Sequence, residues 1–212
     1  MSKSPAPIPP TAIASEFVAS ASQADSLPAS LAVEVAFAGR SNVGKSTLLN
    51  LLLGRRLANI SSTPGRTRTL NFFSVTTRDK SVLSFVDLPG YGFAKRGKGE
   101  RYAWGELVER YLLERPALGL AIVLVDSRRG LEHDDLELLK MLKDEKSGRP
   151  APHVLVVATK LDKMPLSQRK PALATIAKSG PRVLGVSASD PASIDMLWRR
   201  ILATLGLGRA EA

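Results

Sequence analysis

The sequence has no cysteine, only two histidines and few aromatic residues, which make up 5% of its 212 residues. The absence of cysteine excludes disulfides, thiolate nucleophiles and cysteine-based zinc sites, and it fits a reducing compartment. His133 and His153 are separated in the sequence, so we expect no histidine metal centre. The chemistry of this chain must rest on hydroxyl, amide, carboxylate, amino and backbone groups.

Long hydrophobic segments are also missing. The longest apolar run covers residues 117–125, which is far too short to cross a membrane and is typical of a buried strand. The stretch 1–17 lacks the apolar core of a secretory signal. We therefore expect a cytoplasmic protein with no membrane partner.

Acidic residues are outnumbered. The chain has 30 lysines and arginines against 20 aspartates and glutamates, a formal net charge of +10. A basic excess favours polyanions through phosphate contacts and counterion release. We expect a nucleic-acid partner; a charge that serves only solubility is the alternative.

The organisation of the chain indicates one domain, residues 15–205, between a disordered N-terminal tail, 1–14, and a C-terminal tail, 206–212. The expected strands cover 33–38, 70–77, 81–87, 120–126, 153–159 and 182–188. The expected helices cover 45–53, 102–113, 134–142, 167–178 and 191–204. This alternation predicts an α/β fold with a mostly parallel six-stranded sheet, one strand antiparallel, and helices on both faces. Ligands of such sheets bind beyond the carboxyl ends of the strands.

Residues 39–46, GRSNVGKS, match the phosphate-loop pattern G-x-x-x-x-G-K-[ST] between an expected strand and an expected helix. Gly39 and Gly44 let the backbone N–H groups approach phosphate oxygens, and the helix adds its positive end. Lys45 supplies charge to the β- and γ-phosphates, and the Ser46 hydroxyl suits Mg²⁺. These flanks make a chance glycine-rich turn improbable, but the loop alone does not choose between ATP and GTP.

Strands 70–77 and 81–87 flank the turn 78–80 and are expected to form a hairpin, and the segment DLPG, residues 87–90, begins at the end of its second strand. Asp87 can hold Mg²⁺ through water, and the Gly90 N–H can meet the γ-phosphate and swing away when it leaves. Such a segment is an ordinary turn when it stands alone, and it gains meaning from its place after the phosphate loop. In the loop before the hairpin a threonine could bind Mg²⁺; the spacing does not choose among Thr63, Thr67 and Thr69.

The segment TKLD, residues 159–162, selects the base. Asp162 can accept hydrogen bonds from guanine N1–H and its 2-amino group, and adenine offers no matching donor pair. The stem of Lys160 can cover the base plane. Backbone N–H groups of residues 187–189, Ser-Ala-Ser, could bind guanine O6.

Together, GRSNVGKS, PGRTRTLNFF, DLPGYGFA, TKLD and SAS resemble the EngB (YihA/YsxC) family of bacterial ribosome-biogenesis GTPases, within the TrmE-Era-EngA-EngB-septin-like P-loop GTPases. The resemblance covers about residues 15–205. Thr159 replaces the asparagine of the general Asn-Lys-x-Asp motif, and this family also favours threonine there.

The resemblance implies a P-loop GTPase fold and a GTP/GDP switch that assembles the large ribosomal subunit and is linked to normal cell division and septation. Thr67 would be the switch threonine and, with Ser46, a Mg²⁺ ligand, while Lys45, Thr67 and Gly90 would support hydrolysis. We expect a monomer. The expected nucleotide contacts are Gly39, Arg40, Ser41, Asn42, Val43, Gly44, Lys45, Ser46, Thr47, Gly65, Arg66, Thr67, Arg68, Thr69, Asp87, Leu88, Pro89, Gly90, Thr159, Lys160, Leu161, Asp162, Ser187, Ala188 and Ser189.

Two residues bear on the rate of hydrolysis. Tyr91 stands where many GTPases place a water-orienting glutamine, so we predict slow intrinsic hydrolysis. Potassium-stimulated GTPases that resemble this chain carry asparagine at the position of Asn42, where it helps to hold K⁺ against the phosphates. The alternative is that Asn42 only stabilises its loop.

Basic residues gather in the run 91–101, which includes Lys95, Arg96, Lys98 and Arg101. We hypothesise a contact with ribosomal RNA there; a solvated loop is the alternative. Arg55/Arg56 and Arg128/Arg129 are weaker candidates. Two other functions stay open: a P-loop ATPase or small-molecule kinase, and a binding module whose nucleotide is structural.

Overall fold

The computed structural model describes residues 12–30, 32–58, 69–91, 98–143, 150–178 and 182–207, with only the backbone for 98–104. The strands are β1 (Ala12–Ala21), β2 (Val33–Gly39), β3 (Leu70–Thr77), β4 (Val82–Asp87), β5 (Leu118–Asp126), β6 (His153–Thr159) and β7 (Arg182–Gly185). The helices are α1 (Lys45–Leu53), α2 (Lys98–Glu114), α3 (His133–Leu142), α4 (Leu166–Ala177) and α5 (Pro191–Thr204), with short 3-10 helices η1 (Ala24–Ser26) and η3 (Leu161–Lys163).

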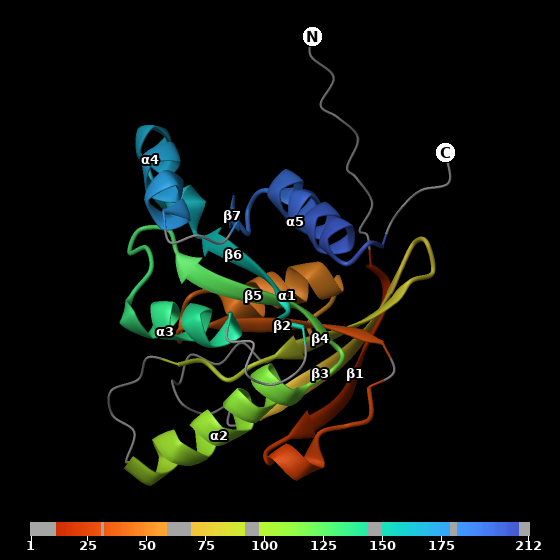
Figure 1. The fold of residues 1–212 in the computed structure, drawn as a ribbon. Coiled ribbons are helices and arrows are strands. Elements are labelled where there is room, and N and C mark those ends of the chain that lie inside the picture. The colour runs from red at the N-terminus through yellow and green to blue at the C-terminus, as the bar shows by residue number, and fades with distance from the viewer. Residues whose placement is uncertain are drawn as a thin grey trace.

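The strands form one sheet in the order β1-β3-β4-β2-β5-β6-β7 (Figure 1). Neighbours pair in parallel from β4 to β7, whereas β3 pairs antiparallel with both β4 and β1. The α/β fold with a mostly parallel sheet and one antiparallel strand is confirmed.

The expected number of six strands was wrong for the described residues, because β1 adds a seventh at the sheet edge. Its inward positions are small, with Ala12, Ser15 and Ala21 buried, so the segment lacks the apolar alternation that marks a strand. Phe17 contacts Phe73 of β3 edge to face, with ring centroids 5.8 Å apart. The strand begins inside the segment expected to be a tail; residues 1–11 lie outside the described residues.

Helices cover both faces of the sheet because strand side chains alternate between them. In β2, Val35 and Phe37 join a core with α1 and α5. Ala36 and Ala38 join a second core with α2, α3 and α4.

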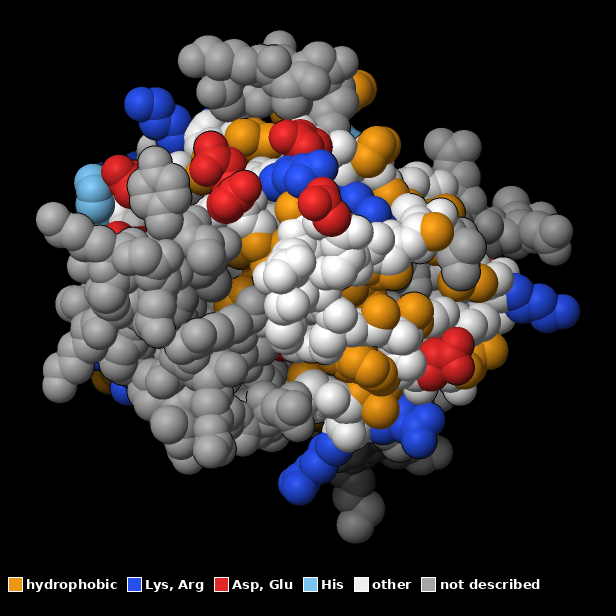
Figure 2. All heavy atoms as spheres, turned by 90° about the horizontal axis from the view of Figure 1, so that it is seen from below, with side chains coloured by type: hydrophobic (Ala, Val, Ile, Leu, Met, Phe, Trp, Pro, Cys, Tyr) orange, Lys and Arg blue, Asp and Glu red, His pale blue; other side chains and the backbone are white. Residues whose placement is uncertain are grey.

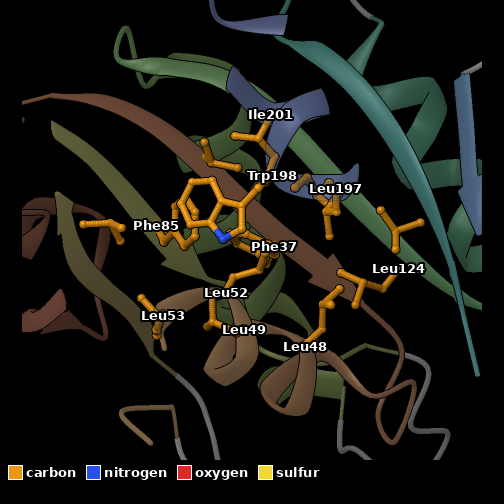
Figure 3. Packing of buried hydrophobic residues seen from close by; sticks show 14 of the residues in the cluster. Phe37, Leu48, Leu49, Leu52, Leu53, Phe85, Leu124, Leu197, Trp198 and Ile201 are labelled. Carbon is orange, nitrogen blue, oxygen red and sulfur yellow. The ribbon is translucent and has the colours of Figure 1, made fainter. Parts of the chain in front are cut away.

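Trp198 lies at the centre of the first core (Figure 3). It is 3% exposed, and its ring stacks on Phe85 at a centroid distance of 5.2 Å. Trp198 is therefore a core residue and does not offer a surface for stacking on RNA bases, whereas the side chain of Trp104 lies outside the described residues.

The predicted limits of α1, β3 and α5 agree with the structure. Helix α2 begins at Lys98 rather than at 102, and β7 ends at Gly185 rather than at 188. The last pairing toward β6 is the bond from Val186 N to Ala158 O, 2.8 Å, and residues 187–189 then leave the sheet as a loop. None of the described helices has the length and apolarity to cross a bilayer.

Candidate functional site

The carboxyl ends of five parallel strands meet at one edge of the sheet, as the topology rule requires. The phosphate loop follows β2, DLPG ends β4, TKLD ends β6 and residues 187–189 follow β7. The motifs identified from the sequence, where described, are thereby brought to the same edge.

Backbone geometry sets up the phosphate loop. Helix α1 begins at Lys45, and Gly44 before it has φ of +103°, a conformation that favours glycine. The Lys45 ammonium group pairs with the carboxylate of Asp87, and their side chains are only 10% and 6% exposed. The helix end and this ammonium group provide positive charge for an anionic ligand.

Gly90 lies against the phosphate loop. A Cβ atom on Gly90 would lie 3.0 Å from Ser41 Oγ and 3.3 Å from Ser41 Cα and N. The backbone of the next residue continues this contact: Ser41 N–H donates to Tyr91 O at 3.1 Å, and Tyr91 N–H donates to Gly39 O at 3.3 Å. A side chain at this position would crowd Ser41, so glycine suits the close backbone approach, apart from any contact with a ligand.

The side chain of Tyr91 faces helix α3. It is 9% exposed, and its hydroxyl donates to Asp135 Oδ1 at 2.7 Å. Burial and the negative charge of Asp135 raise the pKa of Tyr91 far above its usual value. The hydroxyl therefore stays protonated and acts as a donor to α3.

Thr159 and Lys160 join β6 to the phosphate loop. The Thr159 hydroxyl lies 2.7 Å from Val43 O and 3.1 Å from Val125 O. Lys160, with φ of +60°, donates from Nζ to Asn42 O at 2.6 Å. The threonine that replaces the asparagine of the general motif thus bonds directly to the phosphate-loop backbone.

Ser187 fixes the carboxylate of Asp162. Its hydroxyl donates to Asp162 Oδ1 at 2.9 Å, and this bond lowers the pKa of Asp162. Ser187 N donates to Ser193 Oγ, and Ser189 N to Ser187 Oγ, at 3.1 and 3.2 Å. Within the described residues the Ala188 N–H makes no such bond, so it is the donor of this loop left for a ligand.

Sequence reasoning missed Asp126, which ends β5 at the same edge. Its carboxylate accepts bonds from Arg128 at 2.9 and 2.6 Å and lies 3.2 Å from Lys160 Nζ. The Arg128 guanidinium holds the pKa of Asp126 well below its usual range. Arg128, considered above as a contact for RNA, is thus paired with Asp126. Asp126 could have been found from the sequence, because it ends an expected strand as the other motifs do.

Helix α3 was expected from the sequence, but its contacts with this site were not. Arg40 of the phosphate loop reaches Glu132 and Asp134 at 3.2 and 3.0 Å. A cavity of about 270 Å³ lies between the phosphate loop and α3, lined among others by Arg40, Tyr91 and Asp135.

Several predicted site residues lie outside the described residues. They are Gly65, Arg66, Thr67 and Arg68, and, of the basic run, Lys95 and Arg96 together with the side chains of Lys98 and Arg101. Thr69 is described, and its hydroxyl donates to Asn71 Oδ1 at 3.3 Å. The choice of Thr67 as switch threonine stays a prediction.

Comparison with known proteins gives a consistent result. Residues 34–160 match the family model described as 50S ribosome-binding GTPase. The chain is 43% identical over 191 residues to the probable GTP-binding protein EngB of Acidobacterium capsulatum, with 88% of each chain covered. It is 40% identical over 196 residues to the Solibacter usitatus protein of that name, with 92% of this chain and 98% of that protein covered.

Among solved structures the chain is similar to Era in complex with MgGDPNP and nucleotides 1506–1542 of 16S ribosomal RNA. The TM-score is 0.67 and the identity 29%, with 85% of this chain and 58% of Era covered.

Proposed function

The chain belongs to the EngB family of GTP-binding proteins, and on this premise we propose that this GTPase is a nucleotide switch in assembly of the large ribosomal subunit. The main support for this proposal is that the side chains of Lys45, Asp87, Lys160 and Asp162 lie at the same edge of the sheet. That edge combines groups suited to phosphate with a carboxylate suited to guanine.

In the proposed binding mode, the phosphates lie against residues 39–47 and the guanine lies near Asp162. The bond from Ser187 orients the Asp162 carboxylate. The rotation of the carboxylate is therefore already restricted before its oxygens accept hydrogen bonds from guanine. The N–H of Ala188 donates to guanine O6. Thr159 and Lys160 keep the phosphate loop and the base site at a fixed separation.

Magnesium fits the donors present at this edge. The Ser46 hydroxyl and the Asp87 carboxylate are oxygen ligands of the kind Mg²⁺ prefers. In the described part of the chain no group of three His, Cys, Asp or Glu side chains could hold a metal, so phosphate oxygens would complete the coordination. The ion would neutralise charge on the β- and γ-phosphates, with Thr67 as a further proposed ligand.

Hydrolysis should be slow without an activator. The Tyr91 hydroxyl is bonded to Asp135, and phenol is not the amide that orients water in many GTPases. Potassium bound near Asn42 is proposed to supply the missing charge stabilisation. Single-turnover hydrolysis compared in potassium and sodium buffers tests this, and equal rates would remove potassium from the mechanism.

The ribosomal role rests on the family description and on charge. The family model is described as ribosome-binding, and the net charge of +10 favours RNA. On the face shown in Figure 2, the described acidic and basic side chains are interspersed. We retain the basic run 91–101 as the proposed RNA site because of its charge. We further propose a cytoplasmic monomer whose role in ribosome assembly links it to cell division and septation.

Co-sedimentation with purified large ribosomal subunits tests this role. We expect binding with a non-hydrolysable GTP analogue and weaker binding with GDP. Reversing Lys95, Arg96 and Lys98 to glutamate should weaken the binding while GTP affinity is retained. The matched control reverses Lys170, Lys178 and Arg200, three exposed basic residues on and beside α4 and on α5, and makes an equal charge change. No nucleotide-dependent binding by the wild type would contradict the proposed role, and equal losses in the two variants would contradict the proposed site.

A further inference from the structure

The N-terminus of helix α3 holds both loops that face the phosphates. Asp135, 1% exposed, accepts from the Tyr91 hydroxyl through Oδ1 and from Glu132 N through Oδ2, at 2.7 and 2.8 Å. Arg40 bonds the phosphate loop to Glu132 and Asp134. These contacts join three segments that are distant in the sequence.

We propose that Tyr91 and Asp135 are positioning residues that couple helix α3 to the recognition of the γ-phosphate by Gly90. The inference rests on the proposed nucleotide arrangement, in which the Gly90 N–H meets that phosphate.

Gly90 itself has the conformational freedom of glycine, so its neighbours must restrict its N–H direction. Among the contacts of Tyr91, its N–H donates to Gly39 O at the end of β2, its carbonyl accepts from Ser41 N of the phosphate loop, and its hydroxyl donates to Asp135 of α3. Removing the hydroxyl takes away the bond that ties Tyr91 to α3.

The bond between Tyr91 and Asp135 is strong enough to matter. Hydrogen bonds to a charged partner are stronger than those between neutral groups. Asp135 cannot turn to another partner easily, because its second oxygen already accepts from Glu132 N at the start of α3. The pair therefore fixes the end of DLPG relative to a helix rather than to a flexible surface.

The chain contains a matched control for this contact. Tyr111 of α2, fully buried, donates from its hydroxyl to Glu34 Oε2 at 3.0 Å. Glu34 lies near the start of β2, at the sheet edge opposite the nucleotide site. Tyr111→Phe therefore removes a bond of the same chemistry where no ligand is expected.

The experiment measures the affinities of a non-hydrolysable GTP analogue and of GDP for wild type, Tyr91→Phe and Tyr111→Phe, with thermal unfolding of each. Both substitutions should lower the unfolding temperature. Tyr91→Phe should also reduce the ratio of GTP-analogue to GDP affinity about tenfold, while GDP affinity stays within about twofold, since a tenfold ratio corresponds to about 1.4 kcal/mol. Tyr111→Phe should leave the ratio unchanged.

An unchanged ratio in Tyr91→Phe, or equal losses for both nucleotides, would overturn the inference. If Tyr91→Phe does not fold, Asp135→Asn replaces it, because the amide can place its single oxygen at only one of the two positions that accept from Tyr91 and from Glu132. The proposed function fails separately: the wild type would then bind no guanine nucleotide, or would bind GDP and the GTP analogue without the γ-phosphate affecting affinity.

Discussion

Two buried tyrosine–carboxylate pairs lie at opposite edges of the sheet and differ in what they hold. Tyr91 and Asp135 join the end of β4 to α3 beside the phosphate loop. Tyr111 and Glu34 join α2 to the start of β2, where Arg115 closes the cluster at 2.7 Å from Glu34. The first pair fixes a loop next to the proposed nucleotide site, whereas the second fixes a helix against a strand.

From this difference we expect the role of a buried polar contact to depend on the segment that it restrains. Arg115 bonds both oxygens of Glu34 and also donates to Pro28 O at 2.7 Å, so that cluster is complete without a ligand. Substitutions there should change stability alone, and substitutions at the nucleotide edge should change binding.

Arg115→Met should give the largest effect. It leaves the Glu34 carboxylate, 1% exposed, without its cationic partner, so we expect the free energy of unfolding to fall by about 3–5 kcal/mol. Urea denaturation measures this. In the control Arg110→Met, the lost partners Asp25 and Glu114 are exposed, and the change should stay below about 1 kcal/mol. The GTP affinity of the folded protein should be unchanged in both variants. Weaker GTP binding by Arg115→Met would contradict the expectation that the Tyr111–Glu34–Arg115 cluster affects stability alone.

Gly90→Ala should give a smaller effect that falls on binding. Its methyl group would press on Ser41 and displace the phosphate loop, at a cost of about 1–3 kcal/mol. Isothermal titration should show a loss of GTP affinity of roughly 5- to 150-fold, since tenfold corresponds to about 1.4 kcal/mol. Gly105→Ala in α2 is the control, because a methyl group there would meet no described atom within 4 Å beyond its chain neighbours and the backbone of its own helix; it should stabilise the helix by up to about 1 kcal/mol.

Asp126→Asn should give the smallest effect, visible in the pH dependence of stability. Arg128 lowers the pKa of Asp126 below its ordinary value of 3.8, so the folded state favours the charged carboxylate. That contribution, about 1 kcal/mol or less, is present above pH 3.8 and is lost as the pH falls through the lower folded-state pKa. The unfolding temperatures of wild type and variant should therefore approach each other as the pH falls below 3.8. A difference that does not change with pH would contradict the pairing of Asp126 with Arg128.

Much of the fold and of the site follows from local sequence. The apolar patterns of the strands and helices predicted the limits of α1, β3 and α5. Because the carboxyl ends of parallel strands meet at one edge of the sheet, Asp87 and Asp162 could be predicted to lie there. Strand β1 was missed because Ala12, Ser15 and Ala21 carry too little apolar signal to mark an inward face.

The polar contacts to α3 could not be predicted. Tyr91 and Asp135 are 44 residues apart, and neither has a periodic pattern or motif that selects the other. Arg128 looked like a free basic side chain because its pairing with Asp126, two residues away, depends on the turn after β5. Such contacts appear only once the loops are placed.

We propose above that the carboxyl edge of the sheet binds guanine nucleotides and that Asp162 recognises the base. The most direct test is titration of fluorescent GTP, GDP and ATP analogues with Mg²⁺ against wild type and Asp162→Asn. We predict that the wild type binds both guanine nucleotides and not ATP, and that the variant loses roughly a hundredfold in guanine affinity, about 2.7 kcal/mol. ATP binding equal to GTP binding in the wild type, or unchanged guanine affinity in the variant, would contradict it.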